Sequence, residues 1–166
     1  FRSIQQIIMK RPWNLIDLPV YSIASNGKRG LNMNICTYVS AVSMKPKRYA
    51  VAVYHDTCTL TNVSAADTCV LQLLRADQYG LVNVLGKKSG KTYDKASYLR
   101  KKDLLINWKG YEVLKDAAAW IELKTLSRQN AGDHDLFLFD VISFKVNEEK
   151  KILMLKELSK RGLIRI

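Results

Sequence analysis

Short runs of β-forming residues, separated by turn signals, recur along this chain of 166 residues. The first run, "VYSIAS" at residues 20–25, alternates apolar and polar side chains and leads into Asn26-Gly27, a dipeptide that accepts the positive φ angles of a tight hairpin turn. Further strand candidates follow at residues 35–44, 49–54, 68–74, 117–127 and 134–146. Such a series, with only short helical segments between the strands, predicts an antiparallel barrel or sandwich rather than alternating βαβ units.

Helical spacing is confined to short segments. Thr59 has the side chain of a helix N-cap and precedes a short amphipathic stretch, so residues 54–59 are predicted to form a strand-to-helix loop. Residues 77–86 and residues from about 150 to 162 also have helical spacing, each with a glycine at its end. Residues 86–107 hold "GKKSGK" and predict a flexible or partly helical excursion on the surface.

Composition limits the classes of function. A hydrophobic content of 48% suits one domain covering residues 1–166, and no apolar run or signal-peptide pattern points to a membrane, so we expect a cytoplasmic protein. Lysine and arginine outnumber the acids by 27 to 15, which favours anionic partners. The spacing of Cys36, Cys58 and Cys69 fits neither a disulfide framework nor a zinc motif, and we expect no metal site.

Hydroxyl side chains gather around the loop at residues 54–59. Thr57 and Thr59 at the start of a short helix would lie beside free backbone N–H groups and the positive end of the helix dipole, which together predict an anion site. His55 lies in the same loop, where a phosphate contact and an exposed histidine without a role are equally compatible with the pattern. The threonines of the strands are explained by β-propensity alone, so only the loop supports this prediction.

A second histidine, His134, stands between Asp133 and Asp135 at the start of an apolar strand. Neighbouring residues of a strand point to opposite faces, so at most one of these carboxylates can orient the ring. By pattern alone, a histidine at this point of a strand is usually structural. The sequence contains no glycine-rich phosphate loop and no nucleophile signature, which disfavours hydrolases.

Four segments, "LPVYSIAS", "NMNICTYVSAVSMKP", "TCTLTNV" and "AGDHDLFLFDV", follow one another in the order and spacing of the flavin reductase-like, FMN-binding split-barrel family. The sequence resembles this family from about Asp17 to Ser143. The resemblance implies an all-β fold with accessory helices, a Greek-key split β-barrel. It also implies a homodimer that holds FMN near the interface between its subunits.

The resemblance implies site residues as well. Those expected along the edge of the isoalloxazine ring are Asn32, Asn34, Ile35, Cys36 and Thr37. Those expected to hold the FMN phosphate are Tyr54, His55, Thr57 and Thr59, in the loop for which the residues themselves predict an anion site. His134 matches the family's Gly-Asp-His position and is the implied catalytic or nicotinamide-positioning residue. Phe139 replaces a glycine common in the family and is expected to narrow the pocket or block the nicotinamide position.

The function implied is NAD(P)H-dependent flavin reduction, in which a hydride passes from nicotinamide to flavin. One alternative is a flavoredoxin-like electron carrier that exchanges electrons with a protein partner, which Phe139 and the basic surface favour. A distant alternative is a basic barrel that binds single-stranded nucleic acid. Its aromatic residues lie mostly within strand patterns rather than among the basic clusters, so a solvated basic surface explains the charge better and nucleic acid is an unlikely partner.

Overall fold

Strands make up most of the regular structure in the computed structural model, which describes residues 10–165. The strands are β1 (Tyr21–Gly27), β2 (Gly30–Met33), β3 (Val39–Met44), β4 (Lys47–Tyr54), β5 (Thr68–Leu73), β6 (Leu105–Trp108), β7 (Tyr111–Leu114), β8 (Ala119–Asn130) and β9 (His134–Val146). The α-helices are α1 (Cys58–Ala65), α2 (Val82–Leu85), α3 (Lys95–Lys101) and α4 (Leu155–Lys160), with 3-10 turns η1 (Pro12–Asn14) and η2 (Ala76–Leu81). None of the described helices is both long and apolar enough to span a membrane.

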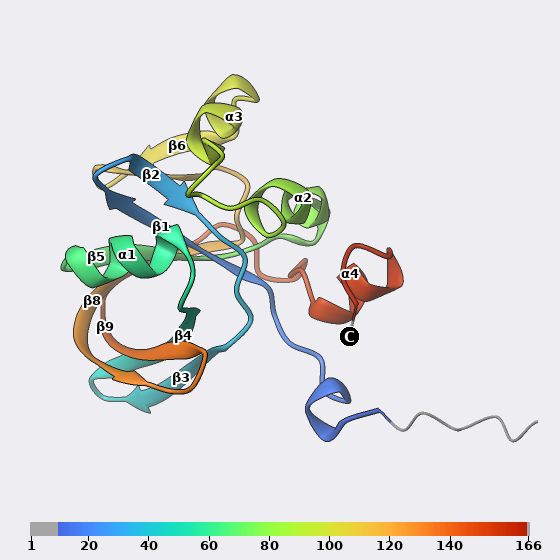
Figure 1. The fold of residues 1–166 in the computed structure, drawn as a ribbon, viewed down its shortest axis with the longest axis horizontal. Coiled ribbons are helices and arrows are strands. Elements are labelled where there is room, and N and C mark those ends of the chain that lie inside the picture. The colour runs from blue at the N-terminus through green and yellow to red at the C-terminus, as the bar shows by residue number, and fades with distance from the viewer. Residues whose placement is uncertain (1–9, 166) are drawn as a thin grey trace, which may run out of the picture.

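The main sheet has seven strands in the order β2-β1-β5-β8-β9-β4-β3, and every neighbouring pair is antiparallel. It curls into an open barrel, with α1 along its side and α2 and α3 beside the β1–β2 end (Figure 1). Strands β8 and β9 form the longest pair, from Ala119 opposite Val146 to Asn130 opposite Asp135. This architecture confirms the predicted all-β fold, a Greek-key split barrel with accessory helices.

Buried apolar side chains form two clusters on opposite faces of the sheet. Ile23 and Leu71 belong to the cluster inside the barrel, whereas their chain neighbours Ala24 and Val70 belong to the cluster under the helices. Because both faces of β1 are covered, residues 22–25 are all buried, including two serines. The alternation of apolar and polar residues in this strand is therefore not an alternation between core and solvent.

Two strand boundaries differ from the prediction. Strand β1 continues through Asn26-Gly27, and the chain turns two residues later, at Lys28-Arg29, with Gly30 in the left-handed region at a φ of 86°. The strand predicted at residues 35–44 begins only at Val39. The reason is that the backbone of Cys36 pairs with Tyr21 in an isolated bridge, which takes residues 34–37 across the end of β1.

The C-terminal helix is shorter than the prediction of residues 150–162. It covers only Leu155–Lys160, because the preceding backbone is used to join other segments. The N–H groups of Ala76 and Val20 donate to the carbonyls of Lys151 and Leu153 at 2.8 and 2.9 Å. These bonds fix residues 151–153 in an extended conformation, so the helix cannot begin before Leu155.

The predicted surface excursion at residues 86–107 is more ordered than its lysine-rich sequence indicates. Helix α3 begins after Asp94, whose carboxylate accepts a hydrogen bond from the Ser97 N–H at 3.0 Å as an N-cap. Strands β6 and β7 then form a separate two-stranded sheet. Folded in this way, the segment brings the "GKKSGK" loop against the open end of the barrel.

Candidate functional site

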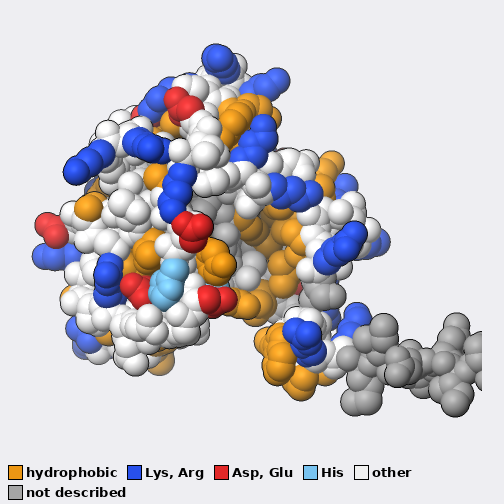
Figure 2. Space-filling view, viewed as in Figure 1, with side chains coloured by type: hydrophobic (Ala, Val, Ile, Leu, Met, Phe, Trp, Pro, Cys, Tyr) orange, Lys and Arg blue, Asp and Glu red, His pale blue; other side chains and the backbone are white. Residues whose placement is uncertain are grey.

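A cavity of about 410 Å³ lies between the open end of the barrel and the loop that follows α2. Its walls come from residues 34–38, the end of β4 with the start of α1, and residues 85–90, together with Asn32, Lys95 and His134. Figure 2 shows this face hollowed between the barrel and the helices, with lysine and arginine side chains on the surrounding surface. All the predicted site residues except His55 line the cavity.

The start of α1 forms one wall. Thr57, rather than the predicted Thr59, is the N-cap: its backbone is extended and its Oγ1 accepts a hydrogen bond from the Leu60 N–H at 3.1 Å. The same hydroxyl donates to the Tyr54 carbonyl at 2.8 Å, which fixes the loop to the end of β4. The helix cap therefore lies two residues earlier than predicted, and helix N-termini with unpaired N–H groups attract anions.

Thr59 is the second residue of the helix and is buried. Its Oγ1 accepts a hydrogen bond from Asn32 Nδ2 at 3.1 Å, so its hydroxyl ties α1 to the end of β2. Thr59 and Asn32 therefore shape the wall of the cavity.

Residues 34–37 form the second wall and are held rigidly. Asn34 Oδ1 accepts a hydrogen bond from the Ile23 N–H at 2.7 Å, and Cys36 exchanges two backbone hydrogen bonds of 2.8 Å with Tyr21. Burial raises the pKa of the Cys36 thiol to about 12, so this cysteine contributes a neutral thiol to the wall. A rigid extended segment of this kind can present backbone and amide groups to a flat ligand.

His134, the first residue of β9, lines the cavity among aromatic side chains. Its ring centroid lies 5.3 Å from those of Tyr38 and Tyr54. Its Nδ1 is 2.6 Å from Asp133 Oδ1, and this hydrogen bond is the main cause of the lowered pKa of Asp133. Asp133 therefore orients the ring, and Asp135 does not. This agrees with the expectation that at most one of the two flanking acids can do so.

His55 does not line the cavity, contrary to the prediction that it holds the phosphate. Its Nε2 lies 2.9 Å from Oδ1 of Asp135, which is buried beside β4 and also pairs with Arg128 at 3.4 Å. Because the His55 ring pairs with this carboxylate, it does not point into the cavity at the start of α1. His55 instead fixes the base of the loop. Its backbone N–H also donates a hydrogen bond to the Asp133 carbonyl at 3.0 Å.

Phe139 neither lines the cavity nor narrows it. The side chain is 0% exposed and stacks on Phe137 inside the barrel, with ring centroids 5.8 Å apart. It shares the inward face with Asp135, whereas His134 lies on the other face of β9. The expectation that Phe139 obstructs the pocket was therefore wrong.

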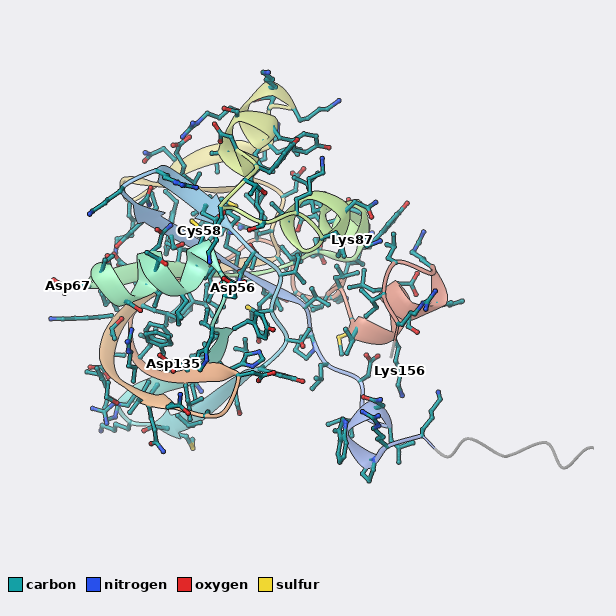
Figure 3. All side chains as sticks on the ribbon, in the orientation of Figure 1. Asp56, Cys58, Asp67, Lys87, Asp135 and Lys156 are labelled. Carbon is teal, nitrogen blue, oxygen red and sulfur yellow. The ribbon has the colours of Figure 1, made fainter. Side chains whose placement is uncertain are left out.

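Sequence reasoning missed the third wall, formed by residues 85–90 and Lys95. Gly90 approaches α1 so closely that an added Cβ would lie 2.3 Å from Asn32 Oδ1 and 2.9 Å from Cys58 Cβ. Figure 3 shows Asp56 and Cys58 at the start of α1 and Lys87 beside α2. Asp56 also forms an ion pair with Lys91, which joins the two loops at the rim. The two glycines of "GKKSGK" were the only signal in the sequence for such an approach.

The lining of the cavity combines two kinds of chemistry. It includes the N-terminus of α1 and a buried lysine, and it also includes two tyrosines and a histidine. The arrangement suits a flat aromatic molecule that carries an anionic group. Residues 10–165 contain no group of three His, Cys, Asp or Glu side chains placed to hold a metal ion.

Comparison with protein families finds a match to the flavin reductase like domain over residues 13–162. A search of curated proteins finds no match to the sequence.

Solved structures superpose on most of the chain. An FMN-binding protein from Thermus thermophilus, with bound 1-cyclohex-2-enone, has a TM-score of 0.73 at 22% identity and covers 88% of this chain and 80% of its own. An NADH:FAD oxidoreductase from Streptomyces globisporus C-1027 has a TM-score of 0.73 at 17% identity, with coverages of 84% and 81%. A flavoredoxin from Methanosarcina acetivorans has a TM-score of 0.72 at 17% identity, with coverages of 84% and 75%. At these identities the likeness establishes the fold.

Proposed function

Because this chain belongs to the flavin reductase-like domain family, whose model matches residues 13–162, we propose that it binds FMN and catalyses NAD(P)H-dependent flavin reduction, transferring a hydride from nicotinamide to flavin. The observation that carries the proposal is the cavity itself, which brings a helix N-terminus, a buried cation and aromatic side chains into one volume of about 410 Å³. FMN combines the matching groups, a phosphate and a flat ring system.

The residues present fit such a ligand. The phosphate would lie at the start of α1, where Thr57 caps the helix and the first backbone N–H groups lack intrahelical partners. Residues 34–37 would lie along the edge of the ring system, because their backbone is fixed by Tyr21 and Ile23 rather than free to collapse into the cavity. Bound flavin would supply the redox chemistry, for which protein side chains have no equivalent.

The protein's own contribution is binding, orientation and the exclusion of water. His134, held by Asp133 and packed between Tyr38 and Tyr54, is the proposed catalytic or nicotinamide-positioning residue. Its ring has one nitrogen directed to Asp133, which leaves the other to meet a substrate that enters beside the two tyrosines.

The first experiment is visible absorption spectroscopy of purified protein with FMN, followed by anaerobic NADH and NADPH. Binding of flavin followed by rapid bleaching with either nucleotide is the expected result. A spectrum that persists with both nucleotides and bleaches with a reduced protein donor would instead identify an electron carrier. The carrier is the second candidate because a flavoredoxin shares the fold and because the net charge of +12 suits an acidic protein partner.

We further propose a homodimer. Exposed large apolar side chains gather on the strands of one part of the barrel, namely Val42 and Met44 on β3, Leu126 on β8, and Leu136, Ile142, Phe144 and Val146 on β9. Soluble monomers rarely expose this much apolar surface, and a second copy of the chain would cover it.

A further inference from the structure

The loop between α2 and α3, residues 86–93, is a strap that lies between two cavities. The main cavity of about 410 Å³ adjoins a second one of about 250 Å³, and Asn32, Cys58, Gly90 and Lys95 line both. Gly90 makes a close contact at this boundary, because an added Cβ would lie 2.3 Å from Asn32 Oδ1 and 2.9 Å from Cys58 Cβ. The strap therefore passes over the start of α1, where one cavity meets the other.

The two ends of the strap are held by buried contacts. Lys95, two residues after the strap, is only 5% exposed, and its Nζ donates hydrogen bonds to the carbonyls of Leu85 and Met33 at 2.8 and 3.0 Å. Leu85 directly precedes the strap and Met33 ends β2, so one side chain joins both ends of the strap to the main sheet. Breaking these bonds would leave buried polar groups without partners, so any movement of the strap is confined to its middle.

The middle of the strap is folded mainly on itself. The N–H groups of Thr92 and Tyr93 donate hydrogen bonds to the Ser89 carbonyl at 3.2 and 2.9 Å, and the Lys91 N–H donates to Ser89 Oγ at 3.2 Å. The Lys88 ammonium lies 4.0 Å from the centroid of the Tyr93 ring. A loop packed by its own side chains in this way can keep its structure when it moves.

Lys91 makes the hydrogen bonds that join the middle of the strap to the other side of the boundary. Its ammonium pairs with Asp56, in the loop before α1 (Figure 3), and its carbonyl accepts a hydrogen bond from Arg29 Nη1 on the β1–β2 turn. Within residues 10–165, no other hydrogen bond joins the strap to the barrel, to α1 or to the loop between them. The side chains of Asp56 and Lys91 are 81% and 48% exposed. Exposed ion pairs stabilise a contact only weakly, so this link is easily opened.

We propose that the strap retains the phosphate end of bound FMN and that the Asp56–Lys91 ion pair is its latch, so that opening of the latch limits how fast flavin enters and leaves. The inference rests on the proposed flavin site, in which the phosphate would lie at the start of α1 under the strap. It adds to that site a moving part and two residues that act without touching the flavin. A strap that is firmly held at its ends and weakly held in its middle can open without unfolding of the domain.

Rate constants distinguish a latch from an ordinary binding contact. Loss of a contact with the bound ligand raises mainly the dissociation rate, whereas loss of a latch raises the association and dissociation rates together and leaves Kd nearly unchanged. Charge gives a further distinction. Asp56→Asn removes a negative charge and Lys91→Met removes a positive one, so attraction of the anionic ligand alone would change the association rate in opposite directions. A latch predicts the same direction for both.

The test measures both rate constants by stopped-flow fluorescence with FMN, whose emission is quenched on binding and recovers on dilution. We expect Asp56→Asn and Lys91→Met each to raise both rate constants about fivefold, with Kd changed by less than about twofold. The matched control is Asp103→Asn, which removes the acid of another exposed ion pair, with Lys115 at 3.2 Å. Neither of these two residues lines a cavity, so the control should leave both rates unchanged.

A second measurement needs no ligand. Trypsin cleavage after Lys87, Lys88 or Lys91, located by mass spectrometry, should be faster in Asp56→Asn than in the wild type or in Asp103→Asn, because cleavage requires an opened segment. Equal cleavage, a rise in the dissociation rate alone, or association rates that change in opposite directions would overturn the latch and leave the proposed function standing. If the variants behave as expected but neither nucleotide bleaches bound FMN, the latch stands and the reductase does not. Absence of any flavin binding would overturn both.

Discussion

The neighbouring residues His134 and Asp135 of strand β9 make different contacts, because their side chains point to opposite faces of the sheet. His134 faces the cavity and is oriented by Asp133, whereas Asp135 is buried and holds His55. The alternation of side chains along a strand predicts that at most one of the two acids can contact the His134 ring. It does not predict which of them does so. Only the path of the preceding turn decides this, and that path depends on Gly132 at a φ of 101°.

The role of His134 can be tested by His134→Ala. We expect NAD(P)H oxidation to slow by about tenfold or more, with FMN still bound at nearly the wild-type affinity, because the ring packs against two tyrosines and its Nδ1 pairs with Asp133 rather than with a group of α1. Stopped-flow spectroscopy under anaerobic conditions measures both. Asp133→Asn keeps the imidazole and weakens its orientation, so it should have a smaller effect. Unchanged turnover in His134→Ala would remove this residue from the mechanism.

At the scale of elements, the cavity depends on the close approach of the loop after α2 to the start of α1. Gly90→Ala should weaken FMN binding by about tenfold, because its Cβ would meet Asn32 and Cys58 at less than the distance that real Cβ atoms keep. The matched control is Gly80→Ala, where an added Cβ has nothing within 4 Å. Fluorescence titration of both variants distinguishes a local effect from a general cost of replacing glycine. Equal affinities of the two variants would show that the approach is not needed for binding.

The cap of α1 makes a second prediction at this scale. Thr57→Ala removes the acceptor for the Leu60 N–H, and we expect the free energy of unfolding to fall by about 1 kcal/mol. Thr57→Ser retains the hydroxyl and should lose little. Urea unfolding of the two variants measures the difference. FMN affinity should fall together with stability in the alanine variant alone, because the helix start also lines the cavity where we propose that the phosphate binds. A serine variant as unstable as the alanine variant would contradict the assignment of the cap.

For the whole molecule, the sequence predicts the order of strands better than the contacts between loops. The strands of the main sheet appear nearly where their β-forming residues lie, because burial against neighbouring strands and helices favours those residue types. Strands β6 and β7 were not predicted. Lys95 could not be found in this way. Its burial depends on two carbonyls that are brought together by the tertiary fold, and a lysine within a basic stretch gives no local signal of burial. The same holds for His55, whose partner Asp135 is distant in sequence.

The exposed apolar strands make the last prediction, which concerns assembly. Met44 on edge strand β3 is 91% exposed and Phe144 on β9 is 69% exposed, and such side chains on a soluble protein favour association through this surface. Light scattering after size exclusion should give twice the mass of one chain, and Phe144→Glu should shift the mass towards one chain, because it places a charge in the apolar contact. Ile106→Glu, at an exposed apolar position on the separate β6–β7 sheet, should leave the dimer intact. A wild-type protein with the mass of one chain would contradict the proposed homodimer.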